Sequence, residues 1–200
     1  MQSLSEDVID FAAARAAMIN SQLRTSGVNA EWVLERMRAV PREAHVPPHA
    51  RAAAYTDRAI RLDDTHSLAA PVFYGTMLQE ARPLPDDSVL IVSPAPGYLA
   101  ELVRPLVASV EVLPPAQAAT PDDRPGKATL LLIDGAAEQI PPALAARLAA
   151  NGRAVGGIIR NGVQRLANGR PAGGALVMQA IMEMGIPPLP ELAAPKAWRF

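Results

Sequence analysis

One stretch of this chain decides its fold class: Ser88-Val89-Leu90-Ile91-Val92-Ser93-Pro94-Ala95-Pro96-Gly97-Tyr98-Leu99-Ala100. The β-branched, apolar run over 89–92 is typical of a buried strand. A tight turn follows it, and the apolar segment that starts at Tyr98 is typical of a helix. A strand, a turn and a helix in this order predict an α/β fold.

The turn between that strand and that helix has an unusual composition. In dinucleotide and S-adenosylmethionine sites such a turn is rich in glycine, so that the backbone approaches the ligand and points N–H groups at it. Here Gly97 is the only glycine, and Ser93, Ala95 and two prolines take the other positions. Each proline removes a backbone donor and fixes φ near about −65°. We therefore expect a stiffened turn with few donors for a ligand.

Strand and helix patterns alternate through the second half of the chain, which predicts a doubly wound, mostly parallel sheet. The apolar run 129–134 is continuous, as expected of a strand that is buried on both faces. Further strands are predicted over 108–113 and 153–159. Helices are predicted over 71–81, from Tyr98 to Pro105, and over 143–150, where Asn151-Gly152 closes the last one. Antiparallel strands are predicted over 163–166, over 175–184 and in the tail to Phe200.

The first part of the chain is predicted to be helical. Apolar positions between residues 4 and 23 fall largely on one helical face, and Gly27 closes that helix. Asn29 is expected to cap a second helix, which Pro41 stops. The following residues, 42–70, have a mostly irregular pattern.

Composition limits the classes of protein that this chain can belong to. Its 200 residues predict one domain, with a helical N-terminal subdomain over 1–70 and an α/β core over 71–200. The 19 basic and 20 acidic residues give a net charge of −1 without a basic block, so neither nucleic acid nor an anionic membrane is an expected partner. There is no cysteine for disulfides or thiolate metal sites, no signal-peptide pattern and no membrane-length apolar run. We expect a soluble, cytoplasmic protein.

The order of these motifs resembles that of the protein-L-isoaspartate O-methyltransferases. The resemblance implies a Rossmann-like methyltransferase sheet and transfer of a methyl group from S-adenosylmethionine to the α-carboxylate of an isoaspartyl residue. No metal is implied. The segments that carry the resemblance are 21–28 with Val33-Leu34 and 40–43, then 54–59, 89–98, 109–111, 131–141 and 186–189.

Four residues are candidates for cofactor binding. Gly97 and Tyr98 match the family's first motif, and Glu111 matches the acidic residue that holds the ribose hydroxyls in the family. Glu111 is also interpretable as an exposed acid at a strand end, which we favour because the glycine turn is missing. Asp134 ends a parallel strand, where ligands bind in such sheets, or it is a helix cap or loop acid.

The departures from the family concern both the cofactor and the substrate. Ile91 replaces an acidic residue, and Ser93 and Ala95 replace glycines. The family's Ser-Gln-Pro motif, whose serine contributes to the active site, is replaced by Ala69-Ala70-Pro71, so we assign no catalytic residue. His66 and Ser67 align upstream of this motif and do not replace it.

The interval 112–128 is too short for the family's pattern. It has 17 residues and several prolines, whereas a helix of about 11 residues, a strand of about 5 and their turns are needed. The sheet is therefore expected to lack one edge strand and the loop that contacts adenine. The strand near 109–113 would then be an edge, and we predict that a second copy of the chain covers it in a homodimer unless Pro114-Pro115 blunts it.

Other polar residues have simpler interpretations. His45 and His49 are four apart, but the two prolines between them prevent a helical metal-binding pair. Arg36, Arg38 and Arg42 are interpreted as solvated charges near a helix end. The three Asn-Gly pairs, which begin at 151, 161 and 168, are interpreted as turn formers.

Two hypotheses for function follow. In the first, the chain is a pseudoenzyme that keeps the fold, has lost S-adenosylmethionine binding, and serves to bind a protein partner or as a structural protein. In the second, it is an active S-adenosylmethionine-dependent protein-L-isoaspartate methyltransferase with a remodelled pocket. The altered turn and Ala69-Ala70 favour the first, whereas Glu111 and Gly97-Tyr98 favour the second.

Overall fold

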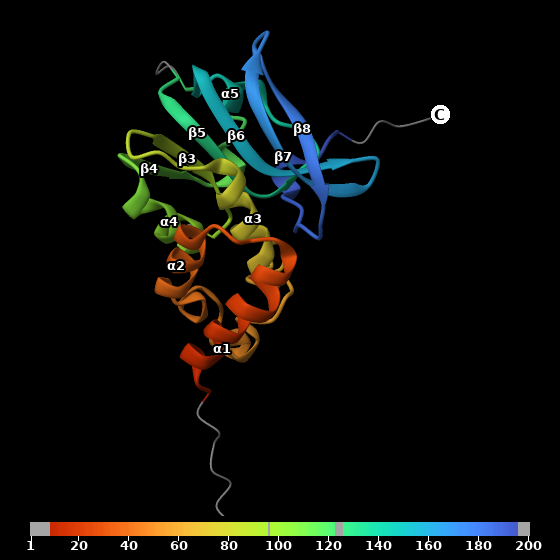
Figure 1. The fold of residues 1–200 in the computed structure, drawn as a ribbon. Coiled ribbons are helices and arrows are strands. Elements are labelled where there is room, and N and C mark those ends of the chain that lie inside the picture. Colours follow the sequence, from red (N-terminus) through yellow and green to blue (C-terminus); the bar gives the residue numbers. More distant parts are fainter. Residues whose placement is uncertain (1–8, 96, 123–125, 196–200) are drawn as a thin grey trace, which may run out of the picture.

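The fold combines a helical N-terminal part with a six-stranded sheet, which lies above the helices in Figure 1. The computed structural model describes residues 9–95, 97–122 and 126–195. None of the helices in these residues is long and apolar enough to cross a membrane.

Within the described residues, the N-terminal helices follow the predicted pattern with one exception; positions 4–8 of the predicted first helix lie outside them. Helix α1 (Phe11–Met18) continues through a π-helical turn (Ile19–Leu23) and a 3-10 turn (Arg24–Ser26), and it ends at Gly27, as predicted, with a φ of 85°. Helix α2 (Glu31–Ala39) ends before Pro41. The prediction that Asn29 caps α2 is wrong.

A side chain from a later part of the sequence satisfies the start of α2. The Oε1 atom of Gln79 accepts hydrogen bonds from the backbone N–H groups of Asn29 and Ala30, at 3.0 and 3.1 Å. These donors are therefore held by a tertiary contact, which no local capping pattern can show.

The region 42–70 is irregular apart from short elements, as predicted. It contains 3-10 turns (Arg42–His45 and Pro48–Ala53) and a small antiparallel hairpin of β1 (Ile60–Arg61) and β2 (Ser67–Leu68). Helix α3 (Pro71–Ala81) follows, with proline in its first turn as predicted. It is buried along most of its length, and it joins the N-terminal part to the sheet (Figure 1).

The main sheet has the strand order β4-β3-β5-β6-β7-β8. The strands β4, β3, β5 and β6 are parallel to one another, β7 pairs antiparallel with β6, and β8 pairs antiparallel with β7. The predicted mostly parallel sheet is therefore confirmed. The strands are β3 (Ser88–Val92), β4 (Ser109–Leu113), β5 (Ala128–Ala137), β6 (Leu148–Arg160), β7 (Val163–Ala172) and β8 (Ala175–Glu183).

Two-residue turns connect the antiparallel strands. Asn161-Gly162 joins β6 to β7, and Gly173-Gly174 joins β7 to β8, all with φ between 54° and 77°. Such turns match the twist of the flanking strands and favour asparagine and glycine. The interpretation of Asn161-Gly162 as a turn is confirmed. The pairs 151–152 and 168–169 lie instead within strands, so their interpretation as turn formers is wrong.

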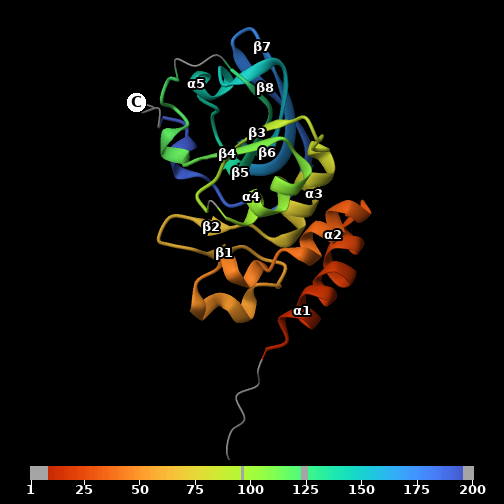
Figure 2. The same cartoon turned by 90° about the vertical axis from the view of Figure 1, so that its left-hand side faces the viewer.

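Helices α3 and α5 cover opposite faces of the sheet, as Figure 2 shows. Alternate residues of β3 separate accordingly: Val89 and Ile91 pack in the cluster of α3, α4 (Tyr98–Val103) and the N-terminal helices, whereas Leu90 and Val92 pack on the side of α5 (Pro142–Ala145). This arrangement is doubly wound, as the sequence predicts.

Two predictions for the second half are wrong. Helix α5 ends at Ala145, and residues 148–150 belong to β6, because Leu148 pairs with Ala128 of β5. Strand pairing therefore overrides the local helical pattern. The tail forms no antiparallel strand within the described residues: it contains a 3-10 turn (Pro190–Leu192), and Pro188 makes one parallel bridge to Ala136.

Among the described residues the sheet ends at β4, in agreement with the predicted loss of one edge strand. In the described part of the following interval, residues 114–122 and 126–127, there is one 3-10 turn (Pro115–Gln117) and no strand. Residues 123–125 of this interval lie outside the described residues. The buried side chain of Ala118 anchors the interval against the α5 side of the sheet.

Candidate cofactor site

A buried polar cluster lies where β3 ends and β5 stops pairing with it; Asp134 lies inside β5 (Ala128–Ala137), so the expectation that it ends a strand, caps a helix or lies in a loop is wrong. Ser93 and Asp134 directly follow Val92 and Ile133, which are register partners in these neighbouring parallel strands. The Ser93 hydroxyl donates to Oδ2 of Asp134 at 2.7 Å, and the Tyr74 hydroxyl donates to Oδ1 at 2.8 Å. Both carboxylate oxygens are thus bound by side chains of the protein.

The environment of Asp134 changes its acidity. Burial raises the pKa of Asp134 from 3.8 to about 6, and the hydroxyls of Ser93 and Tyr74 oppose this rise because they donate to the charged form. Burial, together with the neighbouring carboxylate of Asp134, also raises the pKa of Tyr74 well above its usual value. A buried carboxyl group of this kind is typical of a polar core that is closed to water.

Arg42 supplies the positive charge beside this cluster. Its side chain is fully buried, Nε donates to the carbonyl of Ala54 at 2.8 Å, and Nη2 donates to the carbonyl of Ala69. Its guanidinium carbon lies 5.5 and 5.2 Å from the ring centres of Tyr74 and Tyr98, as in cation–π contacts. The interpretation of Arg42 as a solvated charge is therefore wrong.

Of the other two arginines near the end of α2, Arg36 is also not the solvated charge that the sequence interpretation gives. Arg36 is half-buried and donates to the backbone carbonyls of Glu101 and Leu102, at 2.9 and 3.1 Å, so it ties α2 to α4. Arg38 has an exposed side chain, as the sequence interpretation states.

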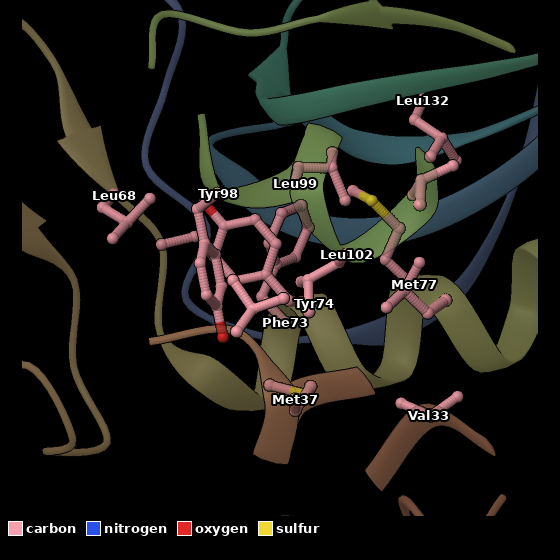
Figure 3. Close-up of a cluster of buried hydrophobic side chains, with 14 of the residues drawn as sticks. Val33, Met37, Leu68, Phe73, Tyr74, Met77, Tyr98, Leu99, Leu102 and Leu132 are labelled. Carbon is pink, nitrogen blue, oxygen red and sulfur yellow. The ribbon is translucent and has the colours of Figure 1, made fainter. Parts of the chain in front are cut away.

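Aromatic rings fill the space between α3 and α4. Tyr74 and Tyr98 meet edge to face with their ring centres 5.0 Å apart, and Figure 3 shows both within the apolar cluster of Phe73, Leu99 and Leu102. The hydroxyl of Tyr98 is buried without a hydrogen-bond partner among the described residues.

The turn that precedes α4 uses its donors internally. The N–H of Ser93 donates to the carbonyl of Leu113 at 3.1 Å, and the N–H of Ala95 donates to the Ser93 hydroxyl at 3.0 Å. Pro94 and Pro96 have no N–H to donate. Only Gly97 retains an N–H among residues 93–97 that these contacts do not use.

His45 covers Gly97. A Cβ atom added at Gly97 would overlap Nδ1 of His45, so the histidine ring fits here only because residue 97 has no side chain. The ring of His45 also lies 5.5 Å from that of Tyr98, and its Nε2 is 3.3 Å from a carboxylate oxygen of Glu101. The one glycine of the turn is thus explained by contact with another part of the chain.

The structure does not gather all four candidate cofactor residues. Gly97 and Tyr98 are adjacent in the chain, and Tyr98 is linked to Asp134 through the ring and hydroxyl of Tyr74. Glu111 is exposed, as the sequence interpretation states, but it is the central residue of β4 and not at a strand end. Its neighbours Val110 and Val112 pack on the face of the sheet that holds Tyr98. Because side chains alternate along a strand, Glu111 faces the opposite side.

Glu111 instead lines a separate cavity of about 240 Å³. This cavity lies near the amino ends of the strands, since Ser88, Ser109 and Ala128 begin β3, β4 and β5 and also line it. Ligands bind at the carboxyl ends of strands in open α/β sheets. A role of Glu111 in holding a ribose remains a prediction.

The positions that correspond to the family's serine and glutamine differ in exposure. Ala69 is buried, and its carbonyl accepts from Arg42. Ala70 precedes α3 and lines an open hollow of about 560 Å³, which also includes Arg58, Ser67 and Gln164. This hollow offers apolar walls with a few polar groups but no nucleophile positioned by Ala69 or Ala70.

His66 joins the β1–β2 hairpin to the C-terminal segment. Its Nδ1 lies 2.9 Å from a carboxylate oxygen of Asp63, and its Nε2 lies 2.9 Å from a carboxylate oxygen of Glu191. Partial burial opposes charging of His66, but the two carboxylates outweigh this effect and raise its pKa above 6.5. No group of three or more potential metal ligands is found among the described residues.

His66→Gln is expected to remove one pH-dependent part of the stability. Because the pKa of His66 is higher in the folded chain, the contribution is present below about pH 6.5 and is lost as the pH rises through the folded value. Urea unfolding from pH 5.5 to 8.5 measures this change, and the variant should lack it. A wild-type profile that matches that of the variant over this range would contradict the expectation.

The fold is that of the Rossmann-like methyltransferases: a mostly parallel sheet with this strand order, helices on both of its faces, and a helical part before it. It is similar to a solved structure of a putative protein-L-isoaspartate O-methyltransferase from Plasmodium falciparum in complex with S-adenosyl-L-homocysteine. The TM-score is 0.71 at 14% identity, covering 89% of this chain and 98% of that one. A second solved protein-L-isoaspartate O-methyltransferase gives a TM-score of 0.69, also at 14% identity, over 90% of this chain and 67% of that one.

The chain belongs to the protein-L-isoaspartate(D-aspartate) O-methyltransferase family, whose model matches residues 13–113. Among curated relatives, the protein-L-isoaspartate O-methyltransferase of Aeropyrum pernix is 42% identical over 115 residues, which are 54% of this chain and 44% of that protein. The protein of the same name from Koribacter versatilis is 37% identical over 106 residues, covering 53% of this chain and 48% of that one. The chain spans about half the length of these relatives.

The family match ends where the sheet loses its edge. Its last residue, Leu113, is also the last residue of β4. The fold similarity continues through the later strands, although the sequence segments 131–141 and 186–189 lie beyond the match.

Proposed function

We propose that this chain is a pseudoenzyme of its family, one that keeps the fold but binds S-adenosylmethionine too weakly for methyl transfer and acts by binding a protein partner. The observation that carries the proposal is the closed cluster of Ser93, Tyr74 and Asp134, which lies where β3 ends beside β5. The polar side chains at the expected cofactor position are hydrogen-bonded to one another.

The cofactor does not fit the residues that are present. Its sulfonium, amino-acid, ribose and adenine parts each need a partner, but the turn donors are used within the protein and His45 lies against Gly97. Glu111 faces away from Tyr98, and the described residues contain no strand beyond β4 to carry an adenine loop. We therefore derive no catalytic step through the cofactor.

The binding free energy that one remaining contact gives S-adenosylmethionine is too small for useful affinity. One charged hydrogen-bonding site contributes about 1.5–3 kcal/mol. A millimolar dissociation constant already requires about 4 kcal/mol. We expect at best millimolar binding of S-adenosylmethionine, even if Glu111 contacts the ribose.

The hollow beside Ala70 supports the binding part of the proposal. It is lined by Phe73, Met184 and Ile186 as well as by polar groups such as Arg58 and Gln164. A concave surface that combines apolar walls with a few polar groups is suited to a segment of a protein partner. The loss of the serine and glutamine next to it is compatible with binding and not with the family's use of that serine.

Calorimetric titration with S-adenosylmethionine and S-adenosylhomocysteine tests the proposal, with the Aeropyrum pernix relative as positive control. We expect no heat of binding for this chain at about 50 μM ligand and no methyl incorporation into an isoaspartyl peptide above a no-enzyme control. A dissociation constant below about 50 μM, which corresponds to roughly 6 kcal/mol, or measurable methylation would instead favour the active enzyme with a remodelled pocket.

A further inference from the structure

The second edge of the sheet, β8, exposes an unusual amount of apolar surface. Of the five large apolar side chains that are exposed among the described residues, three lie on this strand: Val177 at 58%, Ile181 at 39% and Met182 at 40%. The strand has nine residues, and Glu183 is its only charged residue. In Figure 1 the hairpin of β7 and β8 forms the side of the sheet opposite β4.

Edge strands in proteins are usually protected, because their unpaired backbone groups pair readily with another strand. Charges, prolines and short length are common means of protection. Strand β4 has all three features: it has five residues, Glu111 at its centre, and Pro114-Pro115 directly after it. Strand β8 is longer and has no charge before its last residue.

The shape of the sheet leaves the β8 edge accessible. Val177 and Gln179 line an open hollow of about 470 Å³ on one face of the sheet, together with Asn168 and Gly169 of β7. No strand of the described residues pairs with the outer side of β8. A partner that binds this edge by backbone hydrogen bonds therefore has to be an extended strand.

The sequence of β8 is complementary to itself when two copies run antiparallel. With Gln179 on the twofold axis, Val177 of each copy lies opposite Ile181 of the other, and Leu176 lies opposite Met182. Glu183 lies opposite Ala175, so that no like charges are directly opposed. A twofold interface of this kind uses the same patch on both copies and closes without further growth.

We infer that the chain forms a homodimer through antiparallel pairing of β8 with β8 of a second copy, which joins the two sheets. This moves the dimer contact from β4, where the sequence places it, to the longer and more apolar edge strand. The inference is independent of cofactor binding. A bulge near Ile181, where Ala180 pairs with Ala167 and Met182 pairs with Leu166, adds twist to this edge.

The dimer is expected to depend on protein concentration. One strand pair with its side chains buries less than the roughly 1,600 Å² of a standard protein interface. Light scattering of the intact chain at about 200 μM should therefore give twice the mass of one chain, with a fall toward one chain on dilution. The mass of one chain at the highest concentration would refute the inference.

Charged substitutions locate the contact. The double variant Val177→Lys/Ile181→Lys is expected to have the mass of one chain at every concentration, because it places lysines within the apolar pairs. Glu111→Lys on β4 and Leu84→Lys, at an exposed apolar residue outside both edge strands, serve as controls and should remain dimeric. Circular dichroism verifies that each variant is folded. A dimeric β8 variant, or a monomeric Glu111→Lys, would overturn the assignment.

A single cysteine tests the register, since the chain has none of its own. Residues directly opposite in antiparallel strands have Cα atoms about 4.5–5.5 Å apart, within the range of a disulfide. Gln179→Cys should therefore form a covalent dimer under mild oxidation, and the control Ser109→Cys on β4 should not. Equal cross-linking of both variants, or none of Gln179→Cys, would contradict the proposed pairing.

Discussion

Arg42→Ala is expected to lower the free energy of unfolding by about 3–5 kcal/mol, because truncation leaves buried polar groups unpaired and removes a large buried side chain. The side chain of Arg42 is fully buried, and it donates to the carbonyls of Ala54 and Ala69. It is also the positive charge that favours the ionised form of Asp134. Truncation leaves these acceptors without their donor and opens a cavity between the rings of Tyr74 and Tyr98.

Arg38→Ala is the matched control, because Arg38 has an exposed side chain on the same part of the chain. Its substitution should change the free energy of unfolding by no more than about 0.5 kcal/mol. Urea unfolding at pH 7 measures both variants. Equal effects of the two substitutions would show that Arg42 is solvated, as the sequence interpretation has it.

Arg42 shows which part of the site the sequence does not reveal. A charged residue three positions after the end of α2 has the pattern of a solvated charge, and its burial depends on partners from three later segments. The same holds for His45, whose contact with Gly97 joins residues that are 52 positions apart. Local patterns give no signal for such contacts, although Arg42 does lie within the segment 40–43 that carries the family resemblance.

The sheet is more accessible to prediction, because its signals are local. Val89–Val92 and the apolar residues 130–133 are buried on both faces, and side chains of this composition have few alternatives to a central strand. The missing edge strand follows from the length of the interval 112–128 compared with the helix and strand that the family places there. The predicted end of α5 is wrong because the pairing of Leu148 with Ala128 is a long-range contact.

The bounds of β8 are predicted from the sequence, but the exposure of its residues is not. The sequence predicts an antiparallel strand over 175–184, and β8 covers 175–183. The apolar residues 176–178 suggest burial, but the strand lies at the edge of the sheet, where Val177 is 58% exposed. Strand order is set by the whole sheet, so the exposure of this strand becomes visible only in the fold.

Asp134 gives the second large expected effect. Its pKa is raised to about 6 in the folded chain, whereas an unfolded chain has an ordinary value near 3.8. Between these values the folded form holds a proton that the unfolded form has lost, so the free energy of unfolding decreases as the pH rises. The decrease is about 3 kcal/mol in total, is complete above about pH 6.5, and is absent below about pH 4.

Asp134→Asn should remove this decrease, because the amide has no proton to lose in this range. Urea unfolding of both proteins from pH 3.5 to 7.5 isolates the contribution, since other titrating groups are common to the two. Relative to the wild type, the variant is expected to gain about 3 kcal/mol between pH 4 and pH 6.5. The hydroxyls of Ser93 and Tyr74 can accommodate the new amide, because a hydroxyl accepts as well as donates hydrogen bonds.

Ser93→Ala distinguishes the closed cluster from a solvated site. Loss of the Ser93 hydroxyl removes a donor that favours the carboxylate, so the pKa of Asp134 should rise further and the decrease in stability should extend to higher pH. If the site were an open cofactor pocket, water would replace that hydroxyl and hold the pKa of Asp134 near its ordinary value. A wild type and an Asp134→Asn variant with parallel pH profiles would therefore contradict the closed cluster on which the proposed loss of cofactor binding depends.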